Sequence, residues 1–442
     1  MHYSNYNHLV KSGEGKWKLH NFLTGKTIDL DPFGLAFFNT ALEQDENNPV
    51  FQRLLKLGFI VDYDELAFIK TAANSISGMS DELNLVLCPT LGCNFACPYC
   101  FENAKDRKTD LMSEDVQKAI ANVVDKTIEK YGCRRVHVMW YGGEPLLGKE
   151  VIENLSKLLI EIAEKHSAGY SAMIITNGYL LDEQAVRMLE RSRVYKAQIT
   201  IDGPREIHNK TRILKTGAGS FDRIIENISS VKSSISYKIR CNLNRENARH
   251  IQELQSFIDS TAEKSGNSIE LYTCAVWESD AAPETCSITL DKEQFMAGDR
   301  IVDENALGKR RMSCSVIKLF SMVVDCYGKV YKCEETVGDE SAVIGNILDF
   351  KGDLISGLYS SPTCGRGPFT DYLGRVFPFD DEECMSCKVL PICLGGCVNA
   401  RLTGRRRCNR ARFDPDAYVL NIEKIEKINR EKGEENEHQQ TD

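Results

Sequence analysis

The fold is decided by a stretch in which a short apolar run leads into three closely spaced cysteines: Asn84-Leu85-Val86-Leu87-Cys88-Pro89-Thr90-Leu91-Gly92-Cys93-Asn94-Phe95-Ala96-Cys97-Pro98-Tyr99-Cys100. A cubane [4Fe–4S] cluster has four irons, and thiolates are its usual ligands. This loop offers three thiolates in a C-x₃-C-x₂-C spacing. One iron is then left without a ligand from the loop.

The open iron indicates the chemistry. It can bind the amino and carboxylate groups of S-adenosylmethionine and pass one electron to the sulfonium, which releases a 5′-deoxyadenosyl radical. The alternative is a structural zinc knot or a group of buried free cysteines. Zinc sites usually use paired C-x₂-C knuckles, so the spacing favours the iron–sulfur interpretation.

The composition predicts a cytoplasmic protein with reduced thiols. The chain has 442 residues and 17 cysteines, and its first residues show neither the basic region nor the apolar run of a signal peptide. No apolar run approaches the length of a membrane span. In reducing surroundings thiolates serve as metal ligands. The net charge of −9 argues against nonspecific nucleic-acid binding, which needs a basic surface.

From residue 82 onward, strand-like and helix-like segments alternate. This pattern predicts an α/β fold with a parallel sheet, whose chemistry lies at the carboxyl ends of the strands. Helices are expected at 113–131, 150–166 and 182–190. Six strands are expected, at 84–87, 136–140, 172–175, 197–201, 237–243 and 269–274.

Polar motifs follow three of these strands directly. The second strand is followed by Gly142-Gly143-Glu144-Pro145, where glycines let the backbone approach a ligand and a carboxylate can accept hydrogen bonds from an ammonium group. The third is followed by Thr176-Asn177-Gly178, with short polar groups that suit a ribose. The fourth is followed by Asp202, His208 and Arg212, and the arginine suits a carboxylate.

These motifs together resemble those of radical S-adenosylmethionine enzymes. The resemblance implies a partial (β/α)₆ TIM barrel over 78–290, with Cys93, Cys97 and Cys100 on the cluster. It also implies contacts to S-adenosylmethionine: Tyr99 against adenine, the methionine amine at Gly142, Gly143, Glu144 and Pro145, the ribose at Thr176 or Asn177, and the methionyl end at Asp202 and Arg212.

A second cysteine array fills the C-terminal third and resembles the twin auxiliary-cluster extension called SPASM, here 291–420. The resemblance implies one auxiliary [4Fe–4S] cluster on Cys384, Cys387, Cys393 and Cys408. It places Cys314, Cys333 and Cys397 on another, so that the chain would hold three clusters. The fourth ligand there is left open between Cys326, in an expected hairpin turn, Cys364, and a substrate thiolate. A zinc ribbon is the alternative.

Auxiliary clusters can take the electron that a substrate radical loses when a new bond forms, and a carboxylate can take the proton. The related sulfatase-maturing enzymes carry an aspartate directly after the cysteine that Cys333 matches. This chain has Glu334 there. Glu334 is therefore the predicted catalytic base, with an ordinary solvated carboxylate as the alternative.

Residues 1–77 are predicted to form a separate module. Strands are expected at 17–23 and 26–30 around a Thr24-Gly25 turn, followed by a helix capped by Asp31 that runs through Leu42. A second helix is expected at 50–57 and a strand at 59–61. This order resembles winged-helix modules that recognise leader peptides, which bind by adding a strand to a sheet edge. The alternative is a packing appendage of the catalytic domain.

The sequence thus predicts a peptide maturase that modifies a ribosomally made precursor. A thioether crosslink is the first choice and a carbon–carbon crosslink the second. The alternatives are a sulfatase-maturing enzyme that oxidises Cys or Ser to formylglycine, and a noncatalytic iron–sulfur or zinc protein. An electron donor such as a flavodoxin or ferredoxin is expected, with no nucleic-acid or membrane partner. Residues 421–442 are expected to be a charged, partly disordered tail.

Overall fold

The computed structural model describes residues 1–78, 81–100, 107–243, 246–275, 314–360, 372, 374–404, 408 and 410–422. These residues divide into two compact units. The barrel unit contains the described residues between 81 and 275 and those of 318–360. The terminal unit contains 1–78, 314–317 and the described residues from 372 onward. The predicted segment 291–420 thus divides between the units. Cys286, Cys364 and most of the expected tail lie outside the described residues.

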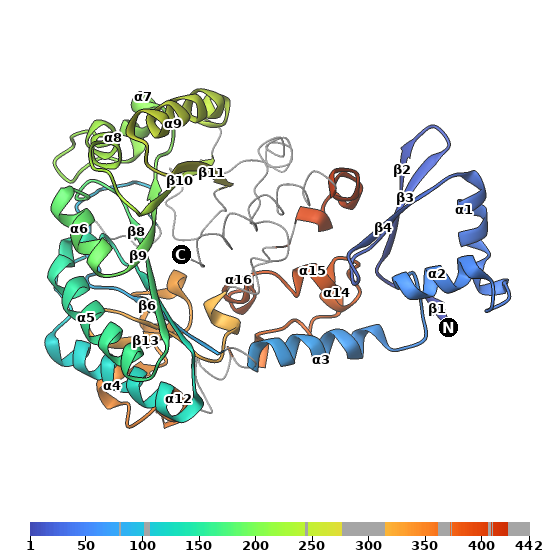
Figure 1. The fold of residues 1–442 in the computed structure, drawn as a ribbon, viewed down its shortest axis with the longest axis horizontal. Coiled ribbons are helices and arrows are strands. Elements are labelled where there is room, and N and C mark those ends of the chain that lie inside the picture. Colours follow the sequence, from blue (N-terminus) through green and yellow to red (C-terminus); the bar gives the residue numbers. More distant parts are fainter. Residues whose placement is uncertain are drawn as a thin grey trace. The chain divides into compact units, whose positions relative to one another are not determined.

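The barrel unit is built on one sheet, in which six parallel strands stand side by side in chain order, as the alternating pattern predicted. Figure 1 shows these strands with the helices along one side of the sheet. The strands are β6 (Glu82–Leu87), β7 (Arg135–Trp140), β8 (Gly169–Thr176), β9 (Val194–Thr200), β10 (Ser236–Leu243) and β11 (Ile269–Ala275). The α/β prediction is therefore confirmed.

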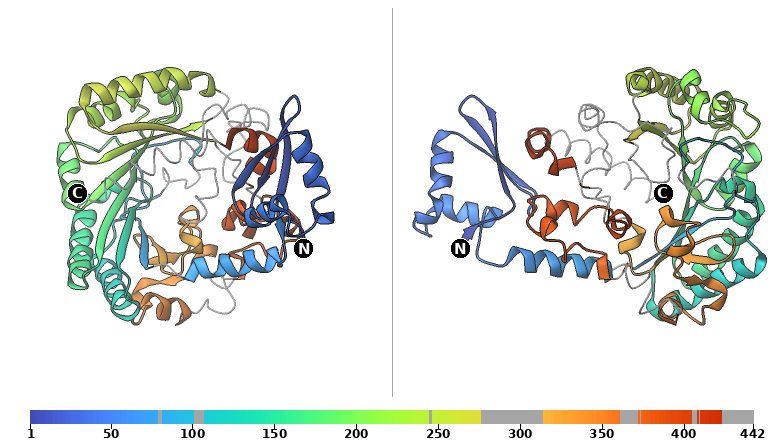
Figure 2. Two further views of the ribbon diagram at one scale, coloured as in Figure 1. Left: turned by 45° about the vertical axis from the view of Figure 1, so that its right-hand side comes forward. Right: turned by 180° about the vertical axis from the view of Figure 1, so that it is seen from behind.

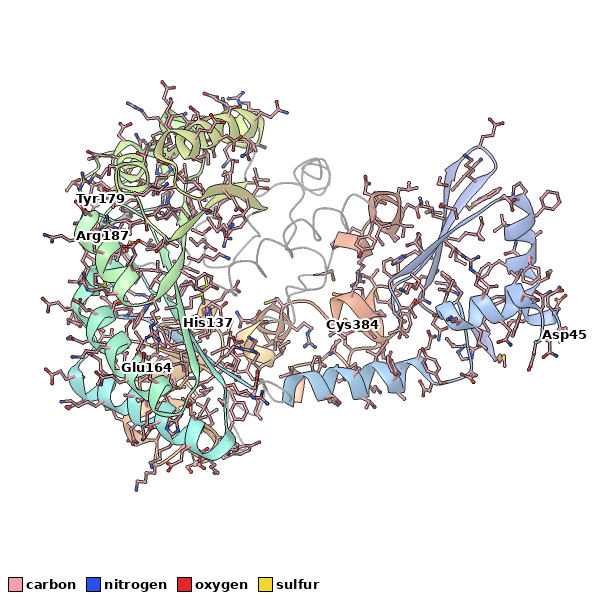
Figure 3. The ribbon with its side chains drawn as sticks, viewed as in Figure 1. Asp45, His137, Glu164, Tyr179, Arg187 and Cys384 are labelled. Carbon is pink, nitrogen blue, oxygen red and sulfur yellow. The ribbon has the colours of Figure 1, made fainter. Side chains whose placement is uncertain are left out.

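The strands alternate in burial because helices cover one face of the sheet. In β7, Val136, Val138 and Trp140 are buried, whereas His137 and Met139 are half-buried. Figure 3 shows His137 on the side of the sheet away from the helices. The helices are α4 (Glu114–Tyr131), α5 (Lys149–Lys165), α6 (Glu183–Arg191), α7 (Arg205–Thr211), α8 (Phe221–Ser230) and α9 (Ile251–Ser265). Both views in Figure 2 show α4 and α5 outside the sheet.

A further strand, β12 (Ser321–Val324), extends this sheet from a distant part of the chain. It pairs in parallel with β6, with Ser321 opposite Asn84 and Val324 opposite Leu87. It continues through an antiparallel hairpin into β13 (Lys329–Tyr331), which pairs with β14 (Gly345–Asn346). The hairpin expected around Cys326 is confirmed, whereas the parallel pairing was not predicted.

The N-terminal module has the predicted mixture of strands and helices. The hairpin of β3 (Lys16–Asn21) and β4 (Lys26–Leu30) is confirmed, and β2 (Asn7–Gly13) adds an unpredicted strand. Helix α1 (Pro32–Asn39) is capped by Asp31 as predicted but ends before Leu42, which lies in a short 3₁₀ turn. Helix α2 (Pro49–Leu57) ends at Gly58 with φ of 81°. Strand β5 (Ile60–Val61) pairs with β1 (His2–Tyr3), and α3 (Glu65–Gly78) follows.

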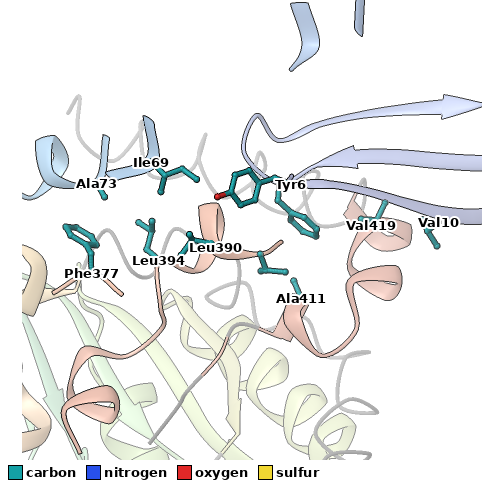
Figure 4. Close-up of a cluster of buried hydrophobic side chains, with 11 residues drawn as sticks. Tyr6, Val10, Ile69, Ala73, Phe377, Leu390, Leu394, Ala411 and Val419 are labelled. Carbon is teal, nitrogen blue, oxygen red and sulfur yellow. The ribbon is translucent and has the colours of Figure 1, made fainter. Parts of the chain in front are cut away.

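Two hydrophobic clusters organise the terminal unit. One lies inside the N-terminal module and includes Leu19, Phe51 and Phe59. The other joins the module to the C-terminal segment, and Figure 4 shows Ile69 and Ala73 of α3 facing Phe377 and Leu394. Its buried members are Tyr6, Val10, Phe22, Ile69, Ala73, Phe377, Val389, Leu390, Leu394, Ala411 and Val419. The module therefore shares a core with the cysteine-bearing segment.

A helix that crosses a bilayer must be both long and apolar. No helix in the described part of the chain has both properties.

Candidate metal and cofactor site

The cysteine loop follows β6 and is held by a second loop that follows α7. Phe95 forms an isolated antiparallel bridge with Leu214. The Ala96 N–H donates to the Ile213 carbonyl at 2.8 Å, and the Lys215 N–H donates to the Asn94 carbonyl at 3.0 Å. These backbone bonds bring the predicted cluster cysteines close to Arg212.

The surroundings of Cys93 suit a metal-bound thiolate. Its sulfur faces the Phe95 N–H at 3.4 Å and the Asn177 side-chain amide at 3.8 Å. Burial, reinforced by the nearby Glu144 carboxylate, raises the pKa of the Cys93 thiol to about 12. A metal ion or cluster would have to displace this proton when it binds.

The predicted cluster ligands are three thiols of one loop, Cys93, Cys97 and Cys100. Among the described residues, no three His, Cys, Asp or Glu side chains meet where one metal ion could bind. In a cubane cluster each thiolate binds a different iron, so the sulfurs of its ligands stand apart. The C-x₃-C-x₂-C spacing along the chain is the observation that favours iron–sulfur ligation.

Glu144 joins the ends of two neighbouring strands. Its side chain is fully buried, and Oε1 accepts hydrogen bonds from the Thr176 hydroxyl at 2.7 Å and the Leu146 N–H at 3.0 Å. Oε2 accepts one from the Asn177 N–H at 2.7 Å. Burial raises the pKa of Glu144, and these hydrogen bonds oppose the rise. The structure therefore gives Glu144 a structural role beside the predicted amine contact.

The two glycines before Glu144 leave room for the chain itself. A Cβ on Gly142, where φ is 110°, would stand 2.4 Å from the Thr90 carbonyl oxygen. A Cβ on Gly143 would stand 2.3 Å from the Gly92 carbonyl oxygen. Both distances are shorter than atoms tolerate, so these positions need glycine because the segment entering the cysteine loop passes over them.

Tyr99, Asp202 and Arg212 form a network at the ends of β6 and β9. The Tyr99 hydroxyl donates to Asp202 Oδ2 and accepts from Arg212 Nη1 at 2.8 Å. Asp202 Oδ1 accepts from the Asn242 N–H at 3.1 Å. The Arg212 guanidinium lies 5.6 Å from the centre of the Phe95 ring. The structure thus brings together three residues that the sequence assigned to the same cofactor.

Two buried donors in this region point to a ligand. Within the described residues, Arg212 Nε and Asn94 Nδ2 are buried and have no hydrogen-bond acceptor. Such groups are rare in folded proteins and usually indicate a missing partner. Burial opposes the charge of Arg212, but Tyr99, Cys97 and Asp202 outweigh it and raise its pKa. A ligand with negative charge, such as a carboxylate, fits this position.

His208 has a role here that sequence reasoning did not assign. It is fully buried, its Nδ1 accepts from the Asp202 N–H at 3.3 Å, and its Nε2 lies 3.0 Å from the Ser220 hydroxyl. Ser220 in turn donates to the Arg212 carbonyl at 2.6 Å. Burial lowers the pKa of His208, so the ring is neutral and carries its proton on Nε2. The sequence signal that could have indicated this role is the spacing of His208 and Arg212, because residues four apart lie on the same face of a helix.

Four of the C-terminal cysteines line one pocket in the terminal unit. They are Cys384, Cys387, Cys393 and Cys408, the set that the sequence assigned to one auxiliary cluster. Figure 3 labels Cys384, which lies in α14 (Glu382–Met385). The next helix, α15 (Leu390–Cys393), ends in a left-handed turn in which Leu394 has φ of 46° and Gly395 φ of 83°. This left-handed segment lies between Cys393 and Cys397.

The second predicted set is spread over both units. Cys314 and Cys397 belong to the terminal unit, and Cys333 belongs to the barrel unit. Cys326 is buried in the β12–β13 turn, where its sulfur is hydrogen-bonded by the backbone of Leu91. Glu334 is half-buried and begins a short 3₁₀ helix (Glu334–Thr336). This ligand set and the catalytic base stay predictions.

Comparisons with known proteins agree with this geometry. Residues 87–258 match the model of the radical SAM superfamily. A cysteine-type anaerobic sulfatase-maturating enzyme of Clostridium perfringens is 25% identical over 365 residues, which cover 76% of this chain and 91% of that enzyme. A serine-type enzyme of Bacteroides thetaiotaomicron is 29% identical over 147 residues, or 32% of this chain and 34% of that enzyme.

Solved structures share the fold at lower identity. The structure of native anSMEcpe with bound AdoMet and Cp18Cys peptide has a TM-score of 0.58 at 21% identity, over 78% of this chain and 99% of that one. The structure of Streptococcus suis SuiB bound to the precursor peptide SuiA has a TM-score of 0.52 at 16% identity, over 91% and 96%. The parallel barrel is therefore shared with both. Residues 87–258 form a radical SAM domain, and the chain is an enzyme homologous to the anaerobic sulfatase-maturating enzymes.

Proposed function

We propose that this radical SAM enzyme matures a ribosomally made precursor peptide by installing an intramolecular crosslink. A thioether is the first choice of bond and a carbon–carbon link the second. The observation that carries the proposal is the module of strands and helices that precedes the barrel in the sequence. The likeness to SuiB supports it, because it covers 91% of this chain, against 78% for the anSMEcpe structure.

The radical chemistry is assigned to the barrel unit. Cys93, Cys97 and Cys100 would hold the [4Fe–4S] cluster. When bound, this cluster supplies the electron that cleaves S-adenosylmethionine to a 5′-deoxyadenosyl radical. A flavodoxin or ferredoxin would deliver that electron.

The chain's own groups would orient the cofactor. Arg212 would hold the methionyl carboxylate, since its buried Nε lacks an acceptor among the described residues. Asp202 would keep Tyr99 and Arg212 in place. Thr176 or Asn177 would contact the ribose, and Tyr99 the adenine. The segment Gly142, Gly143, Glu144 and Pro145 would receive the methionine amine.

Crosslinking also needs an acceptor for one proton and one electron. When a carbon radical and a thiol form a thioether, the S–H bond is lost and one electron must leave with the proton. Glu334 would take the proton. The electron would go to the auxiliary clusters, held by Cys384, Cys387, Cys393 and Cys408 and by Cys314, Cys333 and Cys397.

The module would bind the precursor's leader as an added strand. Its sheet has the order β2-β3-β4, so β4 is an edge strand. Phe33 is the second residue of α1, which follows β4, and it is 86% exposed, which is unusual for a phenylalanine. A leader strand on β4 would form main-chain hydrogen bonds, and an apolar leader residue would cover Phe33.

The test of this function uses the full-length enzyme, reconstituted without oxygen and supplied with S-adenosylmethionine and dithionite. The substrate is a synthetic peptide encoded by a short cysteine-rich reading frame beside this gene. We expect 5′-deoxyadenosine and a peptide that has lost two hydrogens and gained no oxygen. Formation of 5′-deoxyadenosine with an unchanged peptide mass for every such peptide would contradict the proposal.

Leader binding is tested by a matched pair of exposed phenylalanines. Phe33→Ala should weaken binding of the leader peptide in fluorescence anisotropy by about 10- to 100-fold, since an apolar contact of this size contributes about 1.5–3 kcal/mol. Phe68→Ala is the control, because Phe68 lies in α3 of the same module and is 53% exposed. Equal binding by both variants would remove the β4 edge as the leader site.

A sulfatase-maturing activity is the second candidate. It is favoured by the homology to the Clostridium perfringens enzyme, which extends over 91% of that enzyme. A sulfatase-derived peptide carrying the target Cys or Ser would then gain an aldehyde that reacts with a hydrazide probe. Labelling of this peptide, together with no change in the cysteine-rich peptide, would establish this alternative over the crosslinking proposal.

A further inference from the structure

The cysteine pocket of the terminal unit contains one charged side chain. Among the described residues that line it, Arg412 alone carries a charge; the others are Cys384, Cys387, Val389, Leu390, Cys393, Gly395 and Cys408. Apolar walls lower the local dielectric constant, which strengthens the effect of any charge at the pocket. Arg412 is therefore placed to act on whatever the four thiolates hold.

The guanidinium of Arg412 is held in a fixed orientation. Nη1 donates to the Cys408 sulfur at 3.0 Å, and Nη2 binds the Glu383 carboxylate. The side chain of Arg412 is 27% exposed, whereas that of Glu383 is 53% exposed. Solvent screens the carboxylate more than the guanidinium, so Glu383 only partly offsets the positive charge of Arg412 at Cys408. The nearby Asp381 carboxylate accepts from the Cys384 N–H at 3.0 Å.

We propose that Arg412 raises the reduction potential of the auxiliary cluster held by Cys384, Cys387, Cys393 and Cys408. A cluster gains negative charge when it is reduced, and a hydrogen bond from a cation to a ligand sulfur stabilises that state more than the oxidised one. Arg412 would thereby make this cluster the better electron acceptor. The inference rests on the proposed function, since it requires a cluster in this pocket.

The geometry also explains the use of arginine. Its planar fork points one N–H at Cys408 and another at Glu383, so the carboxylate positions the guanidinium against the sulfur. A lysine would bring a point charge without this second anchor. Arg412 would act on the cluster through the Cys408 sulfur and need not touch the substrate.

The experiment measures reduction potentials by EPR-monitored titration in a background with Cys93→Ala, Cys97→Ala and Cys100→Ala, which leaves only the auxiliary clusters. Iron and sulfide content are measured on the same samples. Arg412→Gln should shift one midpoint to a more negative potential with unchanged iron, and Arg412→Lys should shift it less. Glu383→Gln keeps the guanidinium and removes its counter-charge, so it should shift the same midpoint to a more positive potential.

Lys388→Gln is the matched control. Lys388 follows Cys387 directly but is exposed and does not line the pocket, so solvent screens its charge. Its replacement should shift the midpoint less than Arg412→Gln does. Unchanged midpoints in Arg412→Gln with full iron content would overturn the inference, as would equal shifts in Arg412→Gln and Lys388→Gln.

Two further outcomes are separable. Should Arg412→Gln lose the cluster, Glu383→Gln decides alone: a positive shift supports the inference, and no shift or a negative one refutes it. Should Cys384→Ala leave the iron content unchanged, the pocket holds no cluster. That result would contradict both the auxiliary-cluster part of the proposed function and this inference. If the cluster is present but Arg412→Gln leaves its midpoint potential unchanged, only the role of Arg412 is contradicted.

Discussion

At the scale of single residues, the site is a set of groups that hold each other. Glu144 accepts three hydrogen bonds from the chain, and Tyr99 connects Asp202 with Arg212. These residues, which the sequence assigns to cofactor binding, therefore also hold the ends of neighbouring strands together. This double role means that substitutions here change stability as well as binding, and the two effects need separate measurements.

The Tyr99 hydroxyl provides a test at this scale. Tyr99→Phe keeps the ring and removes the bridge between Asp202 and Arg212, which leaves both charges with fewer partners. Losing such a bond costs about 1–3 kcal/mol. We expect the midpoint of urea unfolding to fall and S-adenosylmethionine binding, measured calorimetrically, to weaken.

Tyr179→Phe is the control for this substitution. The Tyr179 ring also contacts Phe95, with 6.1 Å between ring centres, but its hydroxyl is not part of this network. A loss of binding equal to that of Tyr99→Phe would show that the bridge is unimportant.

At the scale of elements, the N-terminal module and the cysteine-bearing C-terminal segment are one packing unit. Helix α3 and the region around β2 and β3 contribute to the same buried cluster as α15. Cys387 and Cys393 pack against this cluster. The module thus packs on the C-terminal segment of its own unit, whereas the alternative in the sequence analysis was packing on the catalytic domain. Leader binding at the β4 edge stays a prediction.

Phe22 tests this shared core. It is 1% exposed, and truncating a buried phenylalanine costs about 3–5 kcal/mol. Phe22→Ala should destabilise the terminal unit in hydrogen exchange and lower the iron retained by the pocket cysteines. Phe33→Ala, at 86% exposure, should change neither quantity.

If Phe22→Ala retained as much iron as the wild type, the idea that the shared core supports the pocket cysteines would be wrong. The same packing means that deleting residues 1–77 would expose the apolar face of the C-terminal segment. Point substitutions are therefore the cleaner test of leader recognition.

At the scale of the whole molecule, the chain distributes its cysteines over two units. The triad Cys93, Cys97 and Cys100 lies in the barrel unit, and the four pocket cysteines lie in the terminal unit. Because the units have separate cores, the two sites should fill independently.

Iron analysis of the reconstituted enzyme checks this expectation. Three cubane clusters would bring about twelve irons per chain, and about four would be lost on Cys384→Ala or on Cys97→Ala. Only Cys97→Ala should abolish 5′-deoxyadenosine formation. Loss of all iron in either variant would contradict independent filling, and about four irons in the wild type would remove the auxiliary clusters.

Much of the barrel followed from local patterns. The alternation of apolar runs with helical periodicity predicted all six parallel strands. In each βα unit the apolar residues are those that the strand and its helix bury against each other, so the pattern is local in the sequence. The motifs at strand ends predicted that Asp202 and Arg212 lie near Tyr99, because parallel strands bring their carboxyl ends to one edge. The cluster role of the cysteine triad stays a prediction. The roles of His208 and Ser220 were missed, since they act through backbone groups that sequence patterns do not mark.

The sequence by itself determined the features from which the chemistry is proposed: three cysteines in one loop, polar groups after successive strands, and a second cysteine array. Only the tertiary structure decided the pairing of β12 with β6, the core shared between the two ends of the chain, and the placement of Arg412 against Cys408. The physical reason is distance along the chain. Local spacing sets which side chains share a turn or a strand end, whereas packing between distant segments depends on which apolar faces remain to be covered once those elements have formed.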